Sequence, residues 1–444
     1  MWLRVAALSF GGPAGQIAVM HRILVEEKKW VDEQRFLHAL NYCMLLPGPE
    51  AQQLATYIGW LMRGLPGGLI AGTLFVLPGF FSILALSIVY ALYQEQPLVA
   101  ALFFGLQAAI LAVVAEAVVR IGRRVLKNQV MVLLALTSFL AIFFLRLPFP
   151  AIVVGAGLIG LLGGLMRPDL FHVLRGHGDQ PRDSGAHVID YNAPHTRPHL
   201  GRAITILLVM GSLWLGPLLA LEYGLDRQQH RVLAEEGWFF SKVSLVTFGG
   251  AYAVLPYVAA EAEQEYHWVT HTEMMAGLGM AESTPGPLIQ VVQFVGFLGA
   301  HRHYREHPGT LSPLWGGIAG SLITNWVTYL PCFMWIFIGA PYVERVRHNR
   351  LLSCALSAIT AAVVGVVLNL ALWFTLKALF GELGTKAWGP WHFYYPITTS
   401  TFSWGTLLLA LAAAIALFQF KRNVLEVLAV SLLAGGLLYW LGVR

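Results

Sequence analysis

The sequence predicts an all-α polytopic membrane protein with two inverted-topology repeats that contain broken or re-entrant helices. Only 12% of its 444 residues are charged and 57% are hydrophobic, whereas soluble domains carry about 25% charged residues. A helix needs about 20 apolar residues to cross a bilayer core of about 30 Å. Nine apolar stretches approach or exceed that length: 66–93, 97–119, 128–147, 149–166, 203–222, 312–341, 351–376, 404–420 and 424–441. The ten-residue alternation typical of membrane β-barrels is absent from the sequence.

The second observation that predicts this fold class is an internal repeat. At one constant offset, Phe10-Gly11-Gly12 aligns with Phe248-Gly249-Gly250, and Pro47-Gly48-Pro49 aligns with Pro285-Gly286-Pro287. Further along, LPGF at 77–80 resembles LPCF at 330–333. Matches in register over this length indicate a duplicated unit. We therefore divide the chain into a first repeat (1–166), a polar linker (167–202), a connecting transmembrane helix (203–222) and a second, inverted repeat (223–444).

The third observation is the charge of the loops, which predicts the inversion. One extra apolar segment, 203–222, precedes the second repeat and turns it over relative to the first. Three short basic loops then fall on the face of the linker, which itself carries five arginines: Arg120, Arg123, Arg124 and Lys127; Arg345, Arg347 and Arg350; Lys421 and Arg422. The positive-inside rule places this face, including the linker, in the cytoplasm.

The FGG and PGP segments leave the number of crossings open. If all four cross the membrane, the chain has 13 spans, with the basic stretch 22–35 outside and the acidic stretch 260–273 inside. If each segment dips into the membrane and returns, nine full spans remain and both charge anomalies disappear. The loop charges favour re-entrant or half-spanning segments.

Paired helix breaks within apolar segments predict the binding site of a secondary transporter. Free N–H groups and the helix dipole attract anions at a helix N-terminus, and glycine allows a ligand to approach the backbone closely. We therefore expect one central anion site, built from residues beside the breaks: Gly11, Gly12, Gln16, His21, Arg22, Pro47, Gly48, Pro49, Gln52, Gly249, Gly250, Ser283, Thr284, Pro285, Gly286 and Gln290. As alternatives, the glutamines and hydroxyls satisfy freed backbone groups, and His21 and Arg22 form a solvated pair at the membrane surface.

Three carboxyl groups within or beside the apolar segments are candidates for carrying a coupling proton. Glu282 directly precedes the second PGP motif and is ranked first. Glu116 lies inside a predicted span, where its repeat partner Asn369 does not titrate, and Glu50 directly follows the first PGP motif. A carboxylate beside a bound dianion would repel it, so proton binding and anion binding would be linked.

Enzymatic, metal and nucleic-acid functions find little support in the sequence. Cys43, Cys332 and Cys354 have no motif spacing, and no HExxH, GxSxG, Walker A or GxGxxG motif stands in a suitable context. We therefore expect no catalytic residues, no cofactor and no metal site, although the five histidines of the linker leave metal binding there as an alternative. The basic residues lie in loops between spans, so the net charge of +5 does not indicate nucleic acid.

At the repeated motifs the chain resembles the chromate transporter family, in its long two-domain form. The matching segments are SFGGPAGQIAVMHR, LLPGPEAQQLA, LPGGLIAGTLFVLPG, TFGGAYAVLPYVA and AESTPGPLIQVVQFVGFLGA. The resemblance implies export of chromate across the inner (plasma) membrane, driven by the proton-motive force, with chromate resistance as its outcome and sulfate as a competitor. A passive oxyanion channel and a sulfate-type anion transporter are the alternatives. The partners implied are the oxyanion, protons and the lipid bilayer, and a homodimer is left open.

Overall fold

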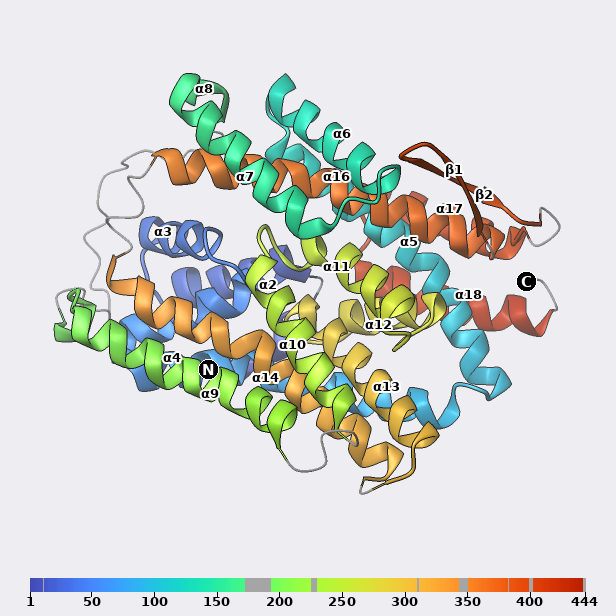
Figure 1. The fold of residues 1–444 in the computed structure, drawn as a ribbon, viewed down its shortest axis with the longest axis horizontal. Coiled ribbons are helices and arrows are strands. Elements are labelled where there is room, and N and C mark those ends of the chain that lie inside the picture. Colours follow the sequence, from blue (N-terminus) through green and yellow to red (C-terminus); the bar gives the residue numbers. More distant parts are fainter. Residues whose placement is uncertain are drawn as a thin grey trace. The chain divides into compact units, whose positions relative to one another are not determined.

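The computed structural model describes residues 1–10, 12–171, 193–224, 230–309, 311–342, 350–381, 383–398 and 402–441 (Figure 1). Gly11, Arg345, Arg347 and most of the predicted linker lie outside these residues. The chain divides into two compact units, each assembled from three separate stretches. Unit 1 comprises 1–85, 175–251 and 284–350, and unit 2 comprises 86–174, 252–283 and 351–444.

Unit 1 contains both FGG motifs and both PGP motifs. Its helix α14 packs against α9, α10 and α13. The elements that lie wholly or mostly in this unit are α1 (Trp2–Leu8), α2 (Gly12–His21), the π-helix η1 (Arg22–Glu27), α3 (Glu33–Cys43), α4 (Glu50–Tyr93), η2 (Pro194–Thr196), α9 (Leu200–Tyr223), α10 (Arg231–Val246), η4 (Leu288–Gln290), α13 (Val291–Glu306), α14 (Pro313–Gly339) and η5 (Ala340–Tyr342).

Unit 2 is organised around α5, which packs against α12, α17 and α18. Its elements are α5 (Pro97–Val125), α6 (Gln129–Phe143), α7 (Phe149–Met166), α8 (Pro168–Phe171), α11 (Ala251–Ala260), the π-helix η3 (Glu261–Glu265), α12 (His271–Ser283), α16 (Arg350–Phe380), α17 (Trp404–Phe418) and α18 (Val424–Trp440). Strands β1 (Leu383–Trp388) and β2 (Trp391–Pro396) form an antiparallel hairpin in register from Leu383 opposite Pro396 to Trp388 opposite Trp391.

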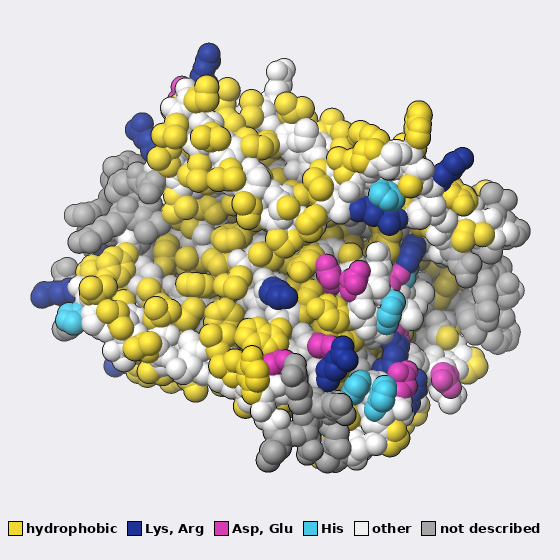
Figure 2. Space-filling model, in the orientation of Figure 1, with side chains coloured by type: hydrophobic (Ala, Val, Ile, Leu, Met, Phe, Trp, Pro, Cys, Tyr) yellow, Lys and Arg dark blue, Asp and Glu magenta, His cyan; other side chains and the backbone are white. Residues whose placement is uncertain are grey.

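The structure confirms the prediction of an all-α polytopic membrane protein. Among the described residues, six helices are long and apolar enough to cross a membrane, namely α4, α5, α7, α9, α14 and α16, and α6, α17 and α18 are shorter apolar helices. Each of the nine predicted stretches lies on one of these helices. Hydrophobic side chains cover large parts of the surface in Figure 2, and Val154, Leu162 and Leu208 are more than half exposed. Apolar residues so exposed on apolar helices indicate contact with lipid.

Helix α4 contains a sharp reversal between the first PGP segment and the predicted stretch 66–93, which the sequence analysis counted as separate membrane segments. Arg63 and Gly64 have non-helical dihedral angles, and Gly64 has a φ of +64°. A methyl group added at Gly59 would contact the backbone of Gly67, which places the segments before and after Gly64 side by side. A straight helix over all 44 residues would extend about 66 Å, about twice the bilayer core. The reversal therefore gives two antiparallel helices, 50–62 and 65–93, as α13 and α14 do in the second repeat.

The two repeats share local structure around the breaks. A short helix, a π-helix and a second short helix follow one another as α2, η1 and α3 and again as α11, η3 and α12. Lys29 and His267, which align in the repeat, both have positive φ, as do the aligned pairs Gly12 with Gly250 and Gly48 with Gly286. The four short helices have 10 to 13 residues, about 15–20 Å of rise. Each by itself is too short to cross the membrane, and the inverted orientation of the second repeat stays a prediction.

Side-chain caps determine where α3 and α12 begin. The carboxylate of Asp32 accepts a hydrogen bond from the backbone N–H of Arg35. At the corresponding position of the second repeat, Thr270 and Glu273 each accept from the other's backbone N–H, which is a capping box. Local sequence therefore determines where both helices begin, and each helix leads into a PGP motif.

Candidate functional site

The four helix breaks lie together in unit 1, joined by two reciprocal hydrogen bonds. The N–H of Gly48, in the first PGP motif, donates to the carbonyl oxygen of Thr247 at 2.7 Å. The N–H of Gly286, in the second PGP motif, donates to the carbonyl oxygen of Ser9 at 3.0 Å. Because Ser9 and Thr247 directly precede the FGG motifs, each PGP motif is bonded to the FGG motif of the other repeat. The predicted convergence of the breaks is thus present in the backbone.

A second reciprocal contact involves the proline-containing parts of α4 and α14. Gly79 of LPGF lies against the second PGP motif, where a methyl group added to Gly286 would come within 3.1 Å of its Cα. Cys332 of LPCF lies against the first PGP motif, where a methyl group added to Gly48 would be 2.6 Å from its Sγ. Both PGP glycines have positive φ, +126° at Gly48 and +104° at Gly286. Glycine is required there both for the backbone conformation and for the close approach.

Buried glutamines connect the breaks to the surrounding helices. Nε2 of Gln16 donates to the carbonyl oxygen of Gly286 at 2.6 Å, and Nε2 of Gln290 donates to that of Val76 at 3.0 Å. Gln52 instead donates to Oγ1 of Thr56. All three glutamines are at most 1% exposed. Gln16 and Gln290 therefore satisfy backbone carbonyl groups, as the alternative interpretation expected.

Two further glutamines of this group were missed by the sequence analysis. Nε2 of Gln53 donates to the carbonyl oxygen of Pro47 at 2.8 Å, and Nε2 of Gln293 donates to that of Phe80 at 3.0 Å. Both are fully buried. Their position in the sequence could have identified them, because each lies within one helical turn of a predicted site glutamine, Gln52 or Gln290, in an apolar segment. Among the described residues, the amide oxygens of Gln52, Gln53, Gln290 and Gln293 have no hydrogen-bond partner.

Glu50 is the predicted coupling carboxyl that lies at the breaks. It is 7% exposed, and its Oε1 is 3.8 Å from the position that a Cβ would occupy at Gly250. A carboxyl that follows the first PGP motif thus faces the second FGG motif. Of the two hydroxyl residues that precede the second PGP motif, Ser283 donates back to the carbonyl oxygen of Met280, and Thr284 is 7% exposed.

His21 and Arg22 form ion pairs with carboxylates near the end of α2. His21 pairs with Glu26 and Glu33, and Nε of Arg22 lies 3.7 Å from Glu27. The side chain of Arg22 is 52% exposed, whereas the side chains described above at the breaks are buried. Both residues therefore have carboxylate partners, and their role at an anion site stays a prediction.

The other two coupling candidates lie in unit 2. Glu282 is 2% exposed and accepts a hydrogen bond from the hydroxyl of Tyr252. Glu116 forms an ion pair with Arg120 at 3.5 Å. Both carboxyl groups therefore have a partner, and Arg120 and Glu116 also interact electrostatically with Glu282.

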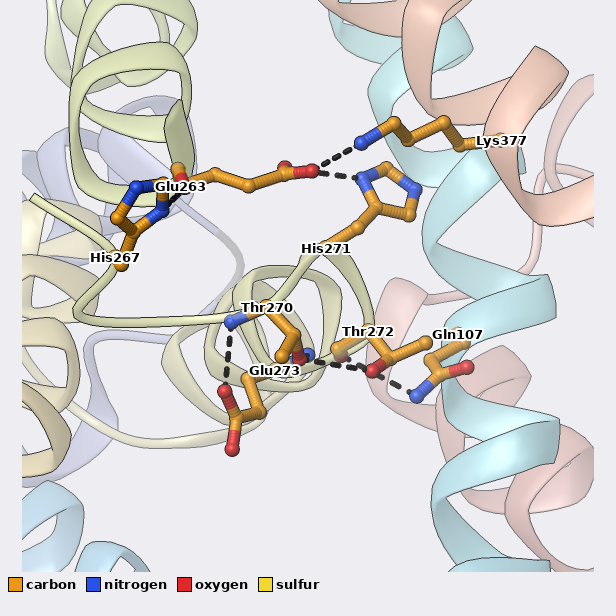
Figure 3. Close-up of polar contacts among 8 residues, drawn as sticks. All are labelled: Gln107, Glu263, His267, Thr270, His271, Thr272, Glu273 and Lys377. Carbon is orange, nitrogen blue, oxygen red and sulfur yellow. Dashed lines mark hydrogen bonds and ion pairs between the residues drawn. The ribbon is translucent and has the colours of Figure 1, made fainter. Parts of the chain in front are cut away.

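The segment that joins α11 to α12 is tied to its surroundings by a cluster of ionisable side chains (Figure 3). Glu263 forms an ion pair with Lys377 of α16 and faces Nδ1 of His271 at 3.7 Å. Lys377 also lies over the ring of Trp373 at 4.4 Å. Nearby, Nε2 of Gln107 on α5 donates to the carbonyl oxygen of Thr272. Three elements of unit 2 thus hold the start of α12.

The charges of this cluster make its stability depend on pH. Burial alone would raise the pKa of Glu263, but the adjacent His271 and the ion pair with Lys377 outweigh it and hold that pKa below its ordinary value. Burial lowers the pKa of His271, from an ordinary value of 6.5. Folded-state pKa values that lie below the unfolded ones give stability that is complete at high pH and is lost as pH falls. The loss of stability begins as pH falls to the ordinary pKa of His271 and continues through the ordinary pKa of Glu263.

We expect Lys377→Met to destabilise the protein by about 1–3 kcal/mol at pH 7.5, because it leaves the half-buried carboxylate of Glu263 without its cation. The difference from the unmodified protein should narrow as pH falls and Glu263 becomes protonated, because a neutral carboxyl no longer needs the cation. Thermal unfolding of purified protein in detergent at a series of pH values measures both effects. Lys386→Met, at an exposed position in β1, is the matched control. A deficit that stayed constant with pH would contradict the ion pair's role.

The described residues hold no group of three or more His, Cys, Asp or Glu side chains arranged to bind a metal ion. The alternative of metal binding by the linker concerns residues that lie mostly outside the described ranges. Within those ranges, the chemistry at the breaks is that of backbone amides, amide side chains and a carboxyl group.

Comparison with known proteins matches residues 1–161 and 234–440 to the chromate transporter family model. The chromate transport protein of Pseudomonas aeruginosa is 30% identical over 376 residues, which cover 82% of this chain and 77% of that one. The chromate transport protein of Cupriavidus metallidurans is 25% identical, with coverage of 82% and 79%. The probable chromate transport protein of Synechococcus elongatus is 26% identical, with coverage of 82% and 81%. No solved structure matches the chain.

Proposed function

The chain belongs to the chromate transporter family, and from this premise we propose that it exports chromate across the inner membrane, driven by the proton-motive force. Sulfate, a dianion of the same shape, would compete with chromate. The chain is a multi-pass membrane protein, and its relatives are named for chromate transport. The proposal includes a homodimer, and cross-linking in the membrane tests it.

The observation that carries the proposal is the reciprocal hydrogen bonding of the four breaks, Gly48 to Thr247 and Gly286 to Ser9. Helices α2 and α4 begin beside these bonds, at Gly12 and Glu50. Helix N-termini present N–H donors and a partial positive charge to an anion. Broken backbone within a membrane is tolerated where protein, water or a ligand satisfies it. We place the oxyanion among these N-termini in unit 1.

Proton coupling follows from a carboxyl close to the anion. At about 5 Å and an effective dielectric constant of about 20, a carboxylate and a dianion repel by about 6–7 kcal/mol. Protonation of the carboxyl removes this repulsion. Export driven by proton entry requires the two ligands to bind in alternation, so the proton binds after the anion has left. Glu282, Glu116 and Glu50 remain the proposed carriers, and Glu50 is the one with a contact at the breaks.

Chromate flux into inside-out membrane vesicles tests this function. In these vesicles the lumen corresponds to the outer side of the membrane, so export appears as uptake. We expect an acidic lumen to accelerate chromate uptake and added sulfate to reduce it. Vesicles that lack the protein are the control. Uptake that proceeds equally without a pH gradient would favour a passive oxyanion channel. Uptake of sulfate with no uptake of chromate would favour a sulfate-type anion transporter.

A further inference from the structure

A carboxyl group that no earlier argument used, Glu236, is wholly buried in unit 1. It lies on α10 and is 0% exposed. Its Oε2 is 2.9 Å from the position that a Cβ would occupy at Gly320 on α14. Neither of its carboxyl oxygens has a hydrogen-bond partner of acceptable geometry among the residues that the structure describes. The backbone amide of Ala300 faces the carboxyl, but that N–H lies inside α13, where the backbone hydrogen bonding of the helix uses it.

No cation among the described residues pairs with Glu236. From Pro313 to Gly339, α14 contains no charged residue, and its titratable side chains are Tyr329 and Cys332. On α13, Tyr304 interacts with Glu236, and its hydroxyl is bonded to His230. The other titratable residues of α13 stand in its last six residues: His301, Arg302, His303, Arg305 and Glu306. The neighbouring Glu235 is already paired with Arg231. The charged residues of α9 stand near its two ends, at Arg202 and Glu222.

This environment favours a carboxyl that carries a proton. An ionised carboxylate without hydrogen bonds in a dry interior costs several kcal/mol, and a group so placed neutralises instead. A neutral carboxyl carries a smaller cost, so the packing of α10 against α13 and α14 is compatible with protonated Glu236. Loss of the proton requires α10 to move until water or a donor reaches the carboxylate.

Helix α10 connects Glu236 directly to the breaks. It ends at Val246, about 15 Å of helix rise beyond Glu236. The next residue, Thr247, accepts the hydrogen bond from the N–H of Gly48 in the first PGP motif, and the second FGG motif follows it. Its hydroxyl also donates back to the carbonyl oxygen of Val243, which fixes Thr247 to the end of α10. A movement of α10 therefore displaces one of the two bonds that hold the breaks together.

We propose that Glu236 is a proton-binding site whose occupancy is linked to oxyanion binding through α10 and the bond between Thr247 and Gly48. The inference rests on the proposed function, and it adds Glu236 to the carboxyl groups proposed there to carry the coupling proton. A proton from the outer side adds to a carboxylate oxygen and gives the neutral, buried carboxyl. On the cytoplasmic side that O–H bond breaks, the proton passes to water, and the carboxylate remains with α10 displaced. Chromate binds in the displaced state, so anion and proton alternate.

The test is Glu236→Gln, which keeps the shape of the neutral carboxyl and removes its proton. Two fluxes are measured in inside-out vesicles: chromate exchange at equal pH on both sides, and chromate uptake driven by a pH gradient. Because the variant imitates the protonated state, in which chromate does not bind, we expect its exchange to fall about tenfold or more, as a typical coupling predicts, and the remaining flux to lose its acceleration by the gradient. Glu235→Gln is the matched control, since it alters the adjacent, ion-paired carboxyl, and it should retain both fluxes.

A second measurement does not depend on transport. Purified protein in a weakly buffered detergent solution should release protons when chromate is added, and Glu236→Gln should release fewer. Normal gradient-driven uptake in Glu236→Gln, or uncoupling by Glu282→Gln while Glu236→Gln stays coupled, would overturn the assignment. Exchange by Glu236→Gln equal to that of the unmodified protein would also overturn it, because a permanently neutral side chain would then not hinder chromate binding. Absence of chromate exchange in the unmodified protein would instead refute the proposed function.

Discussion

Gly250→Leu should abolish chromate transport at normal abundance in the membrane. Gly250 has a φ of +95°, and a methyl group at this position would meet Oε1 of Glu50 at 3.8 Å, an ordinary contact distance. Space therefore exists for a side chain, and a larger one would extend in front of Glu50, where we place the oxyanion. The backbone strain of a non-glycine residue at this φ costs about 1–2 kcal/mol, which reduces stability without preventing folding.

Gly250→Ala separates strain from obstruction in this experiment. Alanine and leucine impose the same backbone strain, so the difference between them reports the volume of the side chain. We expect transport by the leucine variant to be about tenfold or more below that of the alanine variant, a loss of at least about 1.4 kcal/mol. Whole-cell chromate resistance and vesicle flux, each normalised to protein in the membrane, measure it. Equal transport by the two variants would show that Gly250 serves the backbone alone.

Gly79→Ala should have the largest effect on stability. A methyl group there would overlap Oε1 of Gln290 and the backbone carbonyl oxygen of Pro285. The glutamine can rotate, but the carbonyl oxygen belongs to the PGP motif that Gly286 holds to Ser9. Relief of the overlap requires α4 or this motif to shift, and overpacking of this kind costs about 1–3 kcal/mol or more. We expect a lower unfolding temperature in detergent and reduced membrane abundance, with transport reduced in proportion or further.

Two control variants make the interpretation of Gly79→Ala specific. Gly211→Ala, on α9, adds a methyl group with nothing within 4 Å and should leave stability unchanged or improved, because alanine favours the helix. Cys332→Ala removes the sulfur atom at the corresponding contact of the other repeat and should have a smaller effect than Gly79→Ala. An unfolding temperature for Gly79→Ala equal to that of the unmodified protein would contradict the close packing of α4 on the second PGP motif.

Most of the helical architecture could be predicted from the sequence because its signals are local. A run of about 20 apolar residues is stable in a bilayer as a helix whatever surrounds it, so the nine predicted stretches correspond to helices. The breaks are equally local, since Gly48 and Gly286 adopt backbone conformations that other residues rarely do. The same repetition of local signals carried the family resemblance, which the comparisons confirm.

The features that were missed depend on contacts between distant segments. The stretch 383–396 near the end of the chain forms a β-hairpin, whose His392 N–H donates to the carbonyl oxygen of Phe144. Gln293 was missed for the same reason, since its amide donates to the carbonyl oxygen of Phe80 in the first repeat.

The sequence by itself determined that the protein is a helical membrane transporter of repeated design and that its helices break at FGG and PGP. These properties follow from hydrophobicity and backbone preference, which act over a few residues. Only the tertiary structure decided that each PGP motif bonds to the FGG motif of the other repeat and that Glu236 lies buried with no hydrogen-bond partner among the described residues. The physical reason is that the pairing of a backbone amide and the solvation of a carboxyl are determined by whichever atoms packing brings near. At Gly48 and Glu236 those atoms come from residues far away in the chain.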